Sequence, residues 1–95
     1  MSKTNDKEKT VSSVGKRVSL ARMRAGQRGK IVWVSGGCGI VSKLDALGIR
    51  KGKEIAKISE QWMKGPVLVQ LGNSQIALGF GMALKVLVEI TGTGR

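Results

Sequence analysis

Residues 66–90 read PVLVQLGNSQIALGFGMALKVLVEI, and this stretch decides the fold class. Apolar residues recur with the period of two that is typical of half-buried β-strands, which predicts strands over residues 66–71, 74–78 and 86–90. The positions expected to face the core are Val67, Val69, Leu71, Ile76, Leu78, Val86, Val88 and Ile90. Gly72 and Asn73 fit a tight hairpin turn between the first two strands, and residues 79–85 leave room for only one turn of helix.

Two further strands are expected upstream, over residues 30–34 and 54–59. The first contains Trp33, which is expected in the core, with a position at an interface as the alternative. Residues 40–47 predict one short amphipathic helix. Its apolar face is expected to consist of Ile40, Val41, Leu44 and Leu47. Gly48 stands where a left-handed residue ends such a helix. Five short strands and one short helix predict a mainly β fold, a small, partly open SH3-like barrel.

The chain has 95 residues, which is enough for one domain with a small core. Residues 1–18 are polar and lack sustained periodicity, so we expect them to form a flexible, basic N-terminal arm. The barrel is expected over residues 19–91, and residues 92–95 are expected to form a C-terminal tail.

The composition excludes several kinds of chemistry. The chain contains no histidine and a single cysteine, Cys38, which excludes a Ser-His-Asp triad and a zinc site built from several thiolates. The carboxylates of the expected barrel show no paired spacing, so we do not expect an enzyme or an intrinsic metal site. A lone cysteine suits a reducing compartment. Residues 36–39, a glycine-rich loop, fit a packing turn, and an anion-binding nest is the alternative.

Seventeen Lys and Arg against six Asp and Glu give a net charge of +11, which favours anionic partners. Nucleic acid, acidic lipid headgroups and an acidic protein surface all qualify. The basic residues are scattered, and three aromatic residues are few for stacking on bases, so nucleic acid is not the favoured partner. Residues 66–84 are uncharged but contain several Gly, Gln, Asn and Ser residues, so we do not expect them to span a membrane.

A longer pattern resembles a known family. It comprises the glycine-rich loop at residues 36–39, the run KLDALGI at 43–49, Gly65-Pro66-Val67, the Gly72 turn and the segment 82–88. In this order it resembles the FeoA family over residues 19–91. The resemblance implies an SH3-like barrel related to the C-terminal domain of iron-dependent repressors. It also implies a cytoplasmic accessory protein of ferrous iron uptake beside the FeoB permease, and binding of a transition metal, Fe or Zn, as in relatives. The segments 79–82 and 61–64 depart from the family pattern.

Two segments supply the candidate partner-binding residues. Trp62, Met63 and Lys64 are expected at the tip of a hairpin loop, and Arg50, Lys51 and Lys53 in the turn after the helix. Together they predict a mixed basic and apolar surface that binds the FeoB-type permease. Trp62 fits equally a cap over the mouth of the barrel. A nucleic-acid-binding barrel and a metal-responsive regulatory domain are the alternative functions. The sequence is compatible with a monomer and with a homo-oligomer.

Overall fold

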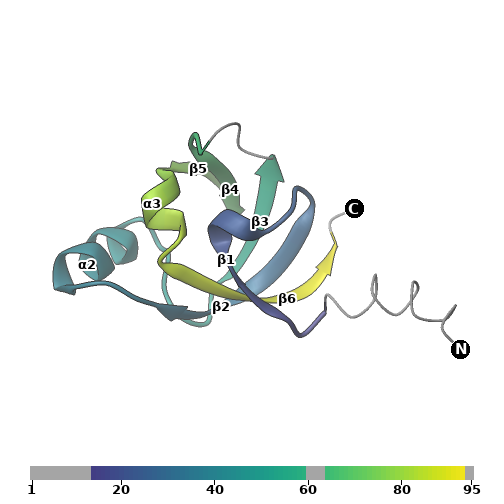
Figure 1. Cartoon of the computed structure of the whole chain (residues 1–95), viewed down its shortest axis with the longest axis horizontal. Coiled ribbons are helices and arrows are strands. Elements are labelled where there is room, and N and C mark those ends of the chain that lie inside the picture. The colour runs from purple at the N-terminus through teal and green to yellow at the C-terminus, as the bar shows by residue number, and fades with distance from the viewer. Residues whose placement is uncertain (1–13, 60–63, 94–95) are drawn as a thin grey trace, which may run out of the picture.

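Six antiparallel strands form one curved sheet in the order β1-β6-β2-β3-β4-β5, in a computed structural model that describes residues 14–59 and 64–93 (Figure 1). The strands are β1 (Arg17–Ser19), β2 (Gln27–Val34), β3 (Glu54–Ser59), β4 (Val67–Leu71), β5 (Ser74–Leu78) and β6 (Val86–Thr93). The helices are η1 (Leu20–Arg22), α2 (Cys38–Ala46) and α3 (Phe80–Ala83). The mainly β fold is confirmed, with six strands where five were expected.

Alternation along the strands predicted the core correctly. Five of the expected inward positions, Val67, Val69, Leu78, Val86 and Val88, are at most 2% exposed. Ile90 is also buried, while Leu71 and Ile76 are half-buried and pack against the same cluster. The bounds of β3 and β5 match the predicted ones, and α3 supplies the single helical turn expected between β5 and β6. The strand pattern of this sequence therefore determines most of the barrel.

Backbone pairing extends the sheet beyond residues 19–91. The Gly15 amide donates to the Ile90 carbonyl at 2.7 Å, and the Ile90 amide donates to the Lys16 carbonyl at 2.8 Å. Residues 17 and 18 then continue this pairing as β1. At the other end β6 continues to Thr93, opposite Gln27. Residues 15–18 of the expected arm and residues 92–93 of the expected tail are thus strand-paired, while residues 1–13 and 94–95 lie outside the described residues.

Trp33 was expected in the core, and this expectation is wrong. Ile31 pairs with Val88 and Trp33 pairs with Leu87, so Val32 is an extra residue in β2. Such a β-bulge shifts the in-out alternation by one residue. Trp33 therefore points outward with Leu87 and is 53% exposed.

The apolar face of α2 is only partly buried. Leu44 is fully buried and Ile40 packs against the core, as expected, but Val41 and Leu47 are 38% and 42% exposed. The helix lies at one side of the barrel, next to the end of β2, and does not lie flat on the sheet (Figure 1). It ends as predicted, because Gly48 has a φ of 92° and its amide donates to the Asp45 carbonyl.

A buried lysine anchors the segment between β1 and β2. Lys57 on β3 is 1% exposed, and its Nζ donates to the Ala21 carbonyl at 3.1 Å and to the Met23 carbonyl at 2.7 Å. The Lys57 carbonyl accepts from the Gly26 amide at 2.9 Å. A positive charge at carbonyls that end a helical turn is electrostatically favourable. Lys57 thereby fixes η1 and the loop that follows it to the middle of the sheet.

Candidate functional site

An apolar groove of about 540 Å³ lies between β2, α2 and the turn after α2. Its lining residues are Trp33, Val34, Gly36, Val41, Asp45, Ile49, Arg50 and Lys51. Trp33 and Val41 are two of the large apolar side chains that the described part of the chain exposes most. We call this surface the Trp33 groove.

The local sequence builds the groove from three features. The bulge in β2 turns Trp33 outward, and the left-handed Gly48 reverses the chain after α2. Buried Ile49 then anchors the following turn. Two backbone hydrogen bonds hold this turn against β2, from the Gly52 amide to the Ile31 carbonyl and from the Ile31 amide to the Lys53 carbonyl, both at 2.8 Å. The turn therefore has a fixed position beside Trp33.

Both basic side chains of the groove already have a contact. The Lys51 Nζ lies 5.1 Å from the centroid of the Trp33 ring, within the range of a cation–π interaction. The Arg50 guanidinium lies 3.4 Å from the Asp45 carboxylate. Both side chains of this ion pair are more than half exposed, so the pair contributes little to stability. The groove thus combines an apolar floor with two cations at its rim.

The structure brings together only part of the predicted partner surface. Arg50 and Lys51 line the groove, and Lys53 lines a neighbouring depression together with Arg50. Lys64 stands in the connection between β3 and β4, whereas Lys53 directly precedes β3. Lys64 is not among the residues that line the groove. Trp62 and Met63 lie outside the described residues.

Trp33 and Val41 line the groove, although the sequence favoured the core for Trp33 and the apolar face of the helix for Val41. Four consecutive apolar residues at 31–34 do not reveal which of them face inward, and the bulge that decides it depends on pairing with β6. The exposure of Val41 depends in turn on where α2 sits against the barrel.

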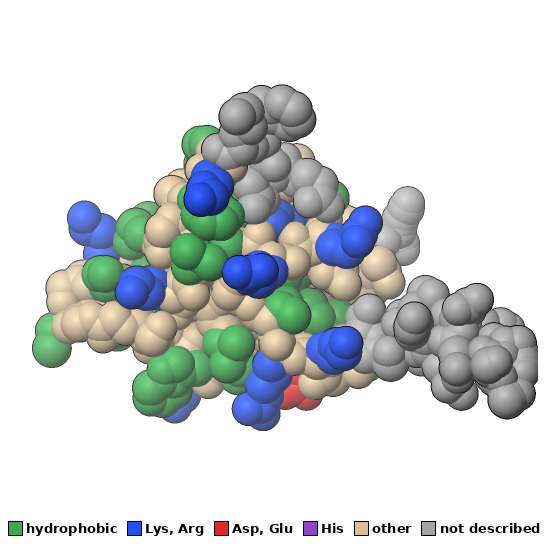
Figure 2. All heavy atoms as spheres, viewed as in Figure 1, with side chains coloured by type: hydrophobic (Ala, Val, Ile, Leu, Met, Phe, Trp, Pro, Cys, Tyr) green, Lys and Arg blue, Asp and Glu red, His purple; other side chains and the backbone are tan. Residues whose placement is uncertain are grey.

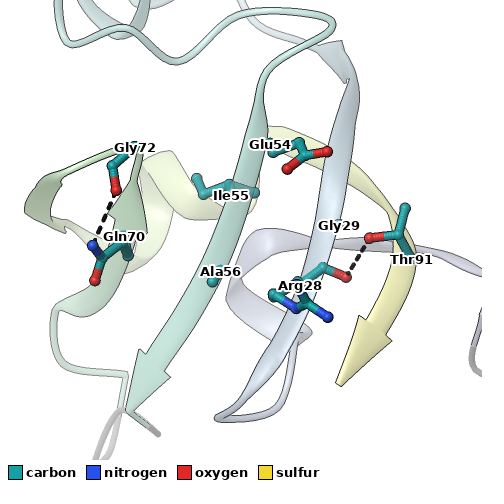
Figure 3. Close-up of a pocket in the computed structure, with 8 residues that line it drawn as sticks. All are labelled: Arg28, Gly29, Glu54, Ile55, Ala56, Gln70, Gly72 and Thr91. Carbon is teal, nitrogen blue, oxygen red and sulfur yellow. Dashed lines mark hydrogen bonds between the residues drawn. The ribbon is translucent and has the colours of Figure 1, made fainter. Parts of the chain in front are cut away.

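A second, more polar pocket of about 250 Å³ lies on the sheet, with lining residues from β2, β3, β4 and β6 (Figure 3). The Thr91 hydroxyl donates to the Arg28 carbonyl at 3.4 Å, and the Gln70 side-chain amide donates to the Gly72 carbonyl at 3.0 Å. These two polar side chains therefore serve the backbone of their own sheet. Glu54 is the only carboxylate in the lining, which gives no pair for acid–base catalysis.

The described residues do not assemble a set of side chains that fits an Fe²⁺ or Zn²⁺ ion. Over residues 14–59 and 64–93, no three His, Cys, Asp or Glu side chains gather where they could hold a metal. Cys38 is exposed at the first position of α2. A structural zinc site takes four ligands of this kind, and a catalytic one takes three.

The basic residues are dispersed over the visible face of the molecule, as the scattered sequence pattern predicted (Figure 2).

At the glycine-rich loop, Gly36 has a φ of 112° and its Cα faces the Ile40 side chain, which is the packing turn that the sequence favoured. In the part of the chain that the structure describes, no helix is both long and apolar enough to cross a bilayer.

Known structures share this fold. A manganese-dependent transcriptional repressor superposes with a TM-score of 0.73 over 81% of this chain and 43% of its own, at 17% identity. The expected relation to the SH3-like C-terminal domains of metal-dependent repressors is thereby confirmed at the level of the fold.

Closer similarities identify the family. The FeoA domain matches residues 18–90. A Methanocaldococcus jannaschii protein, named as an Fe(2+) transport protein A, is 34% identical over 70 residues, which cover 74% of this chain and 83% of that protein. The crystal structure of an iron uptake regulatory protein, FeoA, has a TM-score of 0.75 and 29% identity, and covers 79% of this chain and 99% of its own. Stenotrophomonas maltophilia FeoA in complex with zinc, described as a prokaryotic SH3 domain protein, has a TM-score of 0.65 and 25% identity over 75% and 88% of the two chains. The chain therefore belongs to the FeoA family, which takes part in ferrous iron transport.

Proposed function

We propose that this protein is a cytoplasmic accessory protein of ferrous iron uptake that binds the cytoplasmic part of a FeoB-type permease. It acts by protein–protein contact and carries out no reaction of its own. The observation that carries the proposal is the Trp33 groove, which presents apolar and basic side chains together beside a turn that is hydrogen-bonded to β2.

The chemistry of the described residues supports binding over catalysis. Neither pocket assembles a nucleophile with a base, and the carboxylate of Asp45 is already occupied by Arg50. Exposed Trp and Arg side chains, such as Trp33 and Arg50, are of the types that are enriched in protein interfaces, while Lys is typical of the polar rim.

The two kinds of side chain have different tasks in such a complex. The basic residues of the turn, Arg50, Lys51 and Lys53, accelerate the encounter with an acidic surface, because long-range attraction acts mainly on the association rate. Trp33 slows dissociation, since a buried aromatic ring carries a large share of an interface's binding energy. Trp62, Met63 and Lys64 stay candidate contact residues in this proposal, and Lys64, the described one of the three, does not line the groove.

Co-purification from membranes tests the proposal. Tagged protein is expressed with the full-length permease, and the amount of permease retained and the cellular uptake of Fe²⁺ are both measured. We expect retention by the wild type, and loss of retention and uptake in the double variant Arg50→Glu, Lys51→Glu. The control Lys16→Glu adds negative charge at an exposed residue outside the groove, and it should retain the permease.

Two results would contradict the proposal. One is a wild-type protein that retains no permease while uptake still requires it. The other is salt-sensitive binding to a random-sequence oligonucleotide with an affinity above that for the permease, which would favour the nucleic-acid alternative.

A further inference from the structure

The Trp33 groove is open to a partner, and its chemistry specifies which kind. Its floor is apolar, from Trp33, Val34, Val41 and Ile49. A concave apolar floor accepts an inserted side chain, because insertion removes apolar surface of both partners from water. The floor therefore selects an apolar residue such as Leu, Ile or Phe in the partner.

The basic residues at the rim of the groove favour acidic residues next to the inserted apolar residue of the partner. Lys51 is held over the Trp33 ring at 5.1 Å, and Arg50 is held by Asp45 at 3.4 Å, so both cations stand beside the floor. A carboxylate of the partner can take the place of Asp45 on Arg50 at little cost, because that ion pair is exposed and weak. Two carboxylates next to the inserted residue would satisfy both cations.

The charge of the chain and the shape of the groove disfavour the other occupants. A second copy of this chain would place the same basic rim against the groove, in a protein of net charge +11. Residues 1–13 contain three Lys against one Asp and one Glu, and so carry no net negative charge to offer the rim. A bilayer surface requires apolar side chains that protrude, whereas the groove is concave and two of its apolar lining residues, Val34 and Ile49, are not exposed.

We infer that the Trp33 groove binds an acidic segment in which an apolar side chain is flanked by carboxylates. The inference rests on the proposed function in one respect, since it places that segment in the cytoplasmic part of the permease. The groove's chemistry is independent of that placement, so the two statements can fail separately.

A single-tryptophan protein allows the groove to be observed directly. Trp62→Phe leaves Trp33 as the only tryptophan of the chain. The probes are three synthetic peptides: a leucine flanked by glutamates, the same peptide with lysines in place of the glutamates, and the same peptide with serine in place of the leucine. We expect a saturable blue shift of Trp33 emission with the Glu–Leu peptide, and an affinity at least about tenfold lower for the other two.

Variants of the protein then assign the contacts. Arg50→Glu with Lys51→Glu should weaken binding of the Glu–Leu peptide at least about tenfold and remove most of its salt dependence, while Lys16→Glu should change it by less than about twofold. Trp33→Ala, followed by calorimetry, should abolish measurable binding. Trp33→Phe keeps an aromatic floor and should retain part of it. If Trp33→Ala does not fold, the comparison of Trp33→Phe with the charge variants still decides the question.

The peptide titrations, a vesicle titration and the co-purification of the permease together distinguish the possible results. Equal binding of the glutamate and lysine peptides, or unchanged binding in the charge variants, would overturn the inference. A blue shift with phosphatidylserine vesicles and none with the Glu–Leu peptide would also overturn it and identify a membrane contact. If the wild type retains no permease but the Glu–Leu peptide binds as expected, the proposed function fails and the groove's specificity stands. If the permease is retained equally by wild type and Trp33→Ala, the groove inference and the role of Trp33 in the complex both fail, while binding of the permease through another surface stands.

Discussion

Replacing the buried Lys57 by methionine should destabilise the fold strongly. The Lys57 Nζ donates to two carbonyls at 3.1 and 2.7 Å, at a position where the side chain is 1% exposed. Methionine has a similar volume and leaves no large cavity. The variant therefore isolates the loss of the hydrogen bonds from a loss of packing.

The magnitude follows from the two carbonyls. A hydrogen bond to a charged group contributes about 1.5–3 kcal/mol, so losing the bonds from Lys57 to Ala21 and Met23 costs about 3–6 kcal/mol. Removing the ammonium group also removes the cost of keeping a charge out of water, which offsets part of this loss. We expect a net loss of about 2–4 kcal/mol, which corresponds to a melting point about 10–20 °C lower in a domain of this size.

Urea denaturation of the wild type, Lys57→Met and Lys30→Met measures this loss. Lys30 is exposed on β2, so its replacement by methionine should change the free energy of unfolding by less than about 0.5 kcal/mol. Hydrogen exchange should locate the effect, with faster exchange at the Gly26 amide, whose acceptor is the Lys57 carbonyl. A Lys57→Met protein within about 0.5 kcal/mol of the wild type would refute the role of Lys57 as an anchor.

Three further predictions concern the helix end, the chain termini and metal binding. Gly48→Val should cost more than about 1 kcal/mol in denaturant unfolding, because a β-branched residue is strained at a φ of 92° and its Cβ would lie 3.0 Å from the Leu71 side chain; an unchanged midpoint would refute the left-handed helix end. Deletion of residues 1–13 should leave the thermal melting point unchanged, whereas deletion of residues 1–18 should lower it, because the pairing of β1 with β6 is lost; equal melting points of the two deletions would contradict this. Anaerobic calorimetry with Fe²⁺ and with Zn²⁺ should detect no one-to-one micromolar site in the isolated protein, and such a site that disappears in Cys38→Ser would overturn this expectation.

Local pattern was sufficient for most of the sheet. The strands β3, β4 and β5 lie side by side, and each is bounded by residues that end a strand, such as the Gly72-Asn73 turn. The inward positions of β4 and β5 follow from alternation, because the pairing between these two strands runs in register without a bulge, whereas β3 has an irregularity against β4 only after Lys57. In such strands the sequence contains all the information that decides which side chains are buried.

The expectations from the sequence were wrong or incomplete where a segment distant in the chain decides which way a side chain points or whether a strand forms. The outward position of Trp33 depends on the bulge against β6, and β1 forms because β6 offers an edge more than sixty residues away. Strand β1 has three residues, too few for any periodicity to be recognised. The half-exposed face of α2 depends in the same way on tertiary packing.

Lys57 is a different case, because the alternation of residues in β3 does indicate that its side chain is buried. In β3 the alternation that places Ile55 inside also places Lys57 inside, two residues later. A lysine on the inward face of a strand requires an acceptor, and carbonyls at the end of a short helical turn supply it. The identity of those carbonyls, at Ala21 and Met23, follows only from the fold.

Lys57 and Trp33 allow stability and binding to be measured separately in one experiment. Trp33→Ala removes a ring that is about half buried, which is worth about 1–3 kcal/mol of unfolding free energy, so reduced binding in this variant alone could reflect partial unfolding. Lys57→Met is expected to lose as much stability or more, yet Lys57 does not line the groove. Well below both melting points, Lys57→Met should therefore bind the Glu–Leu peptide as tightly as the wild type, while Trp33→Ala should not bind it. Equal loss of binding in the two variants would show that the groove depends on global stability, and Trp33 would then have no specific role in recognition.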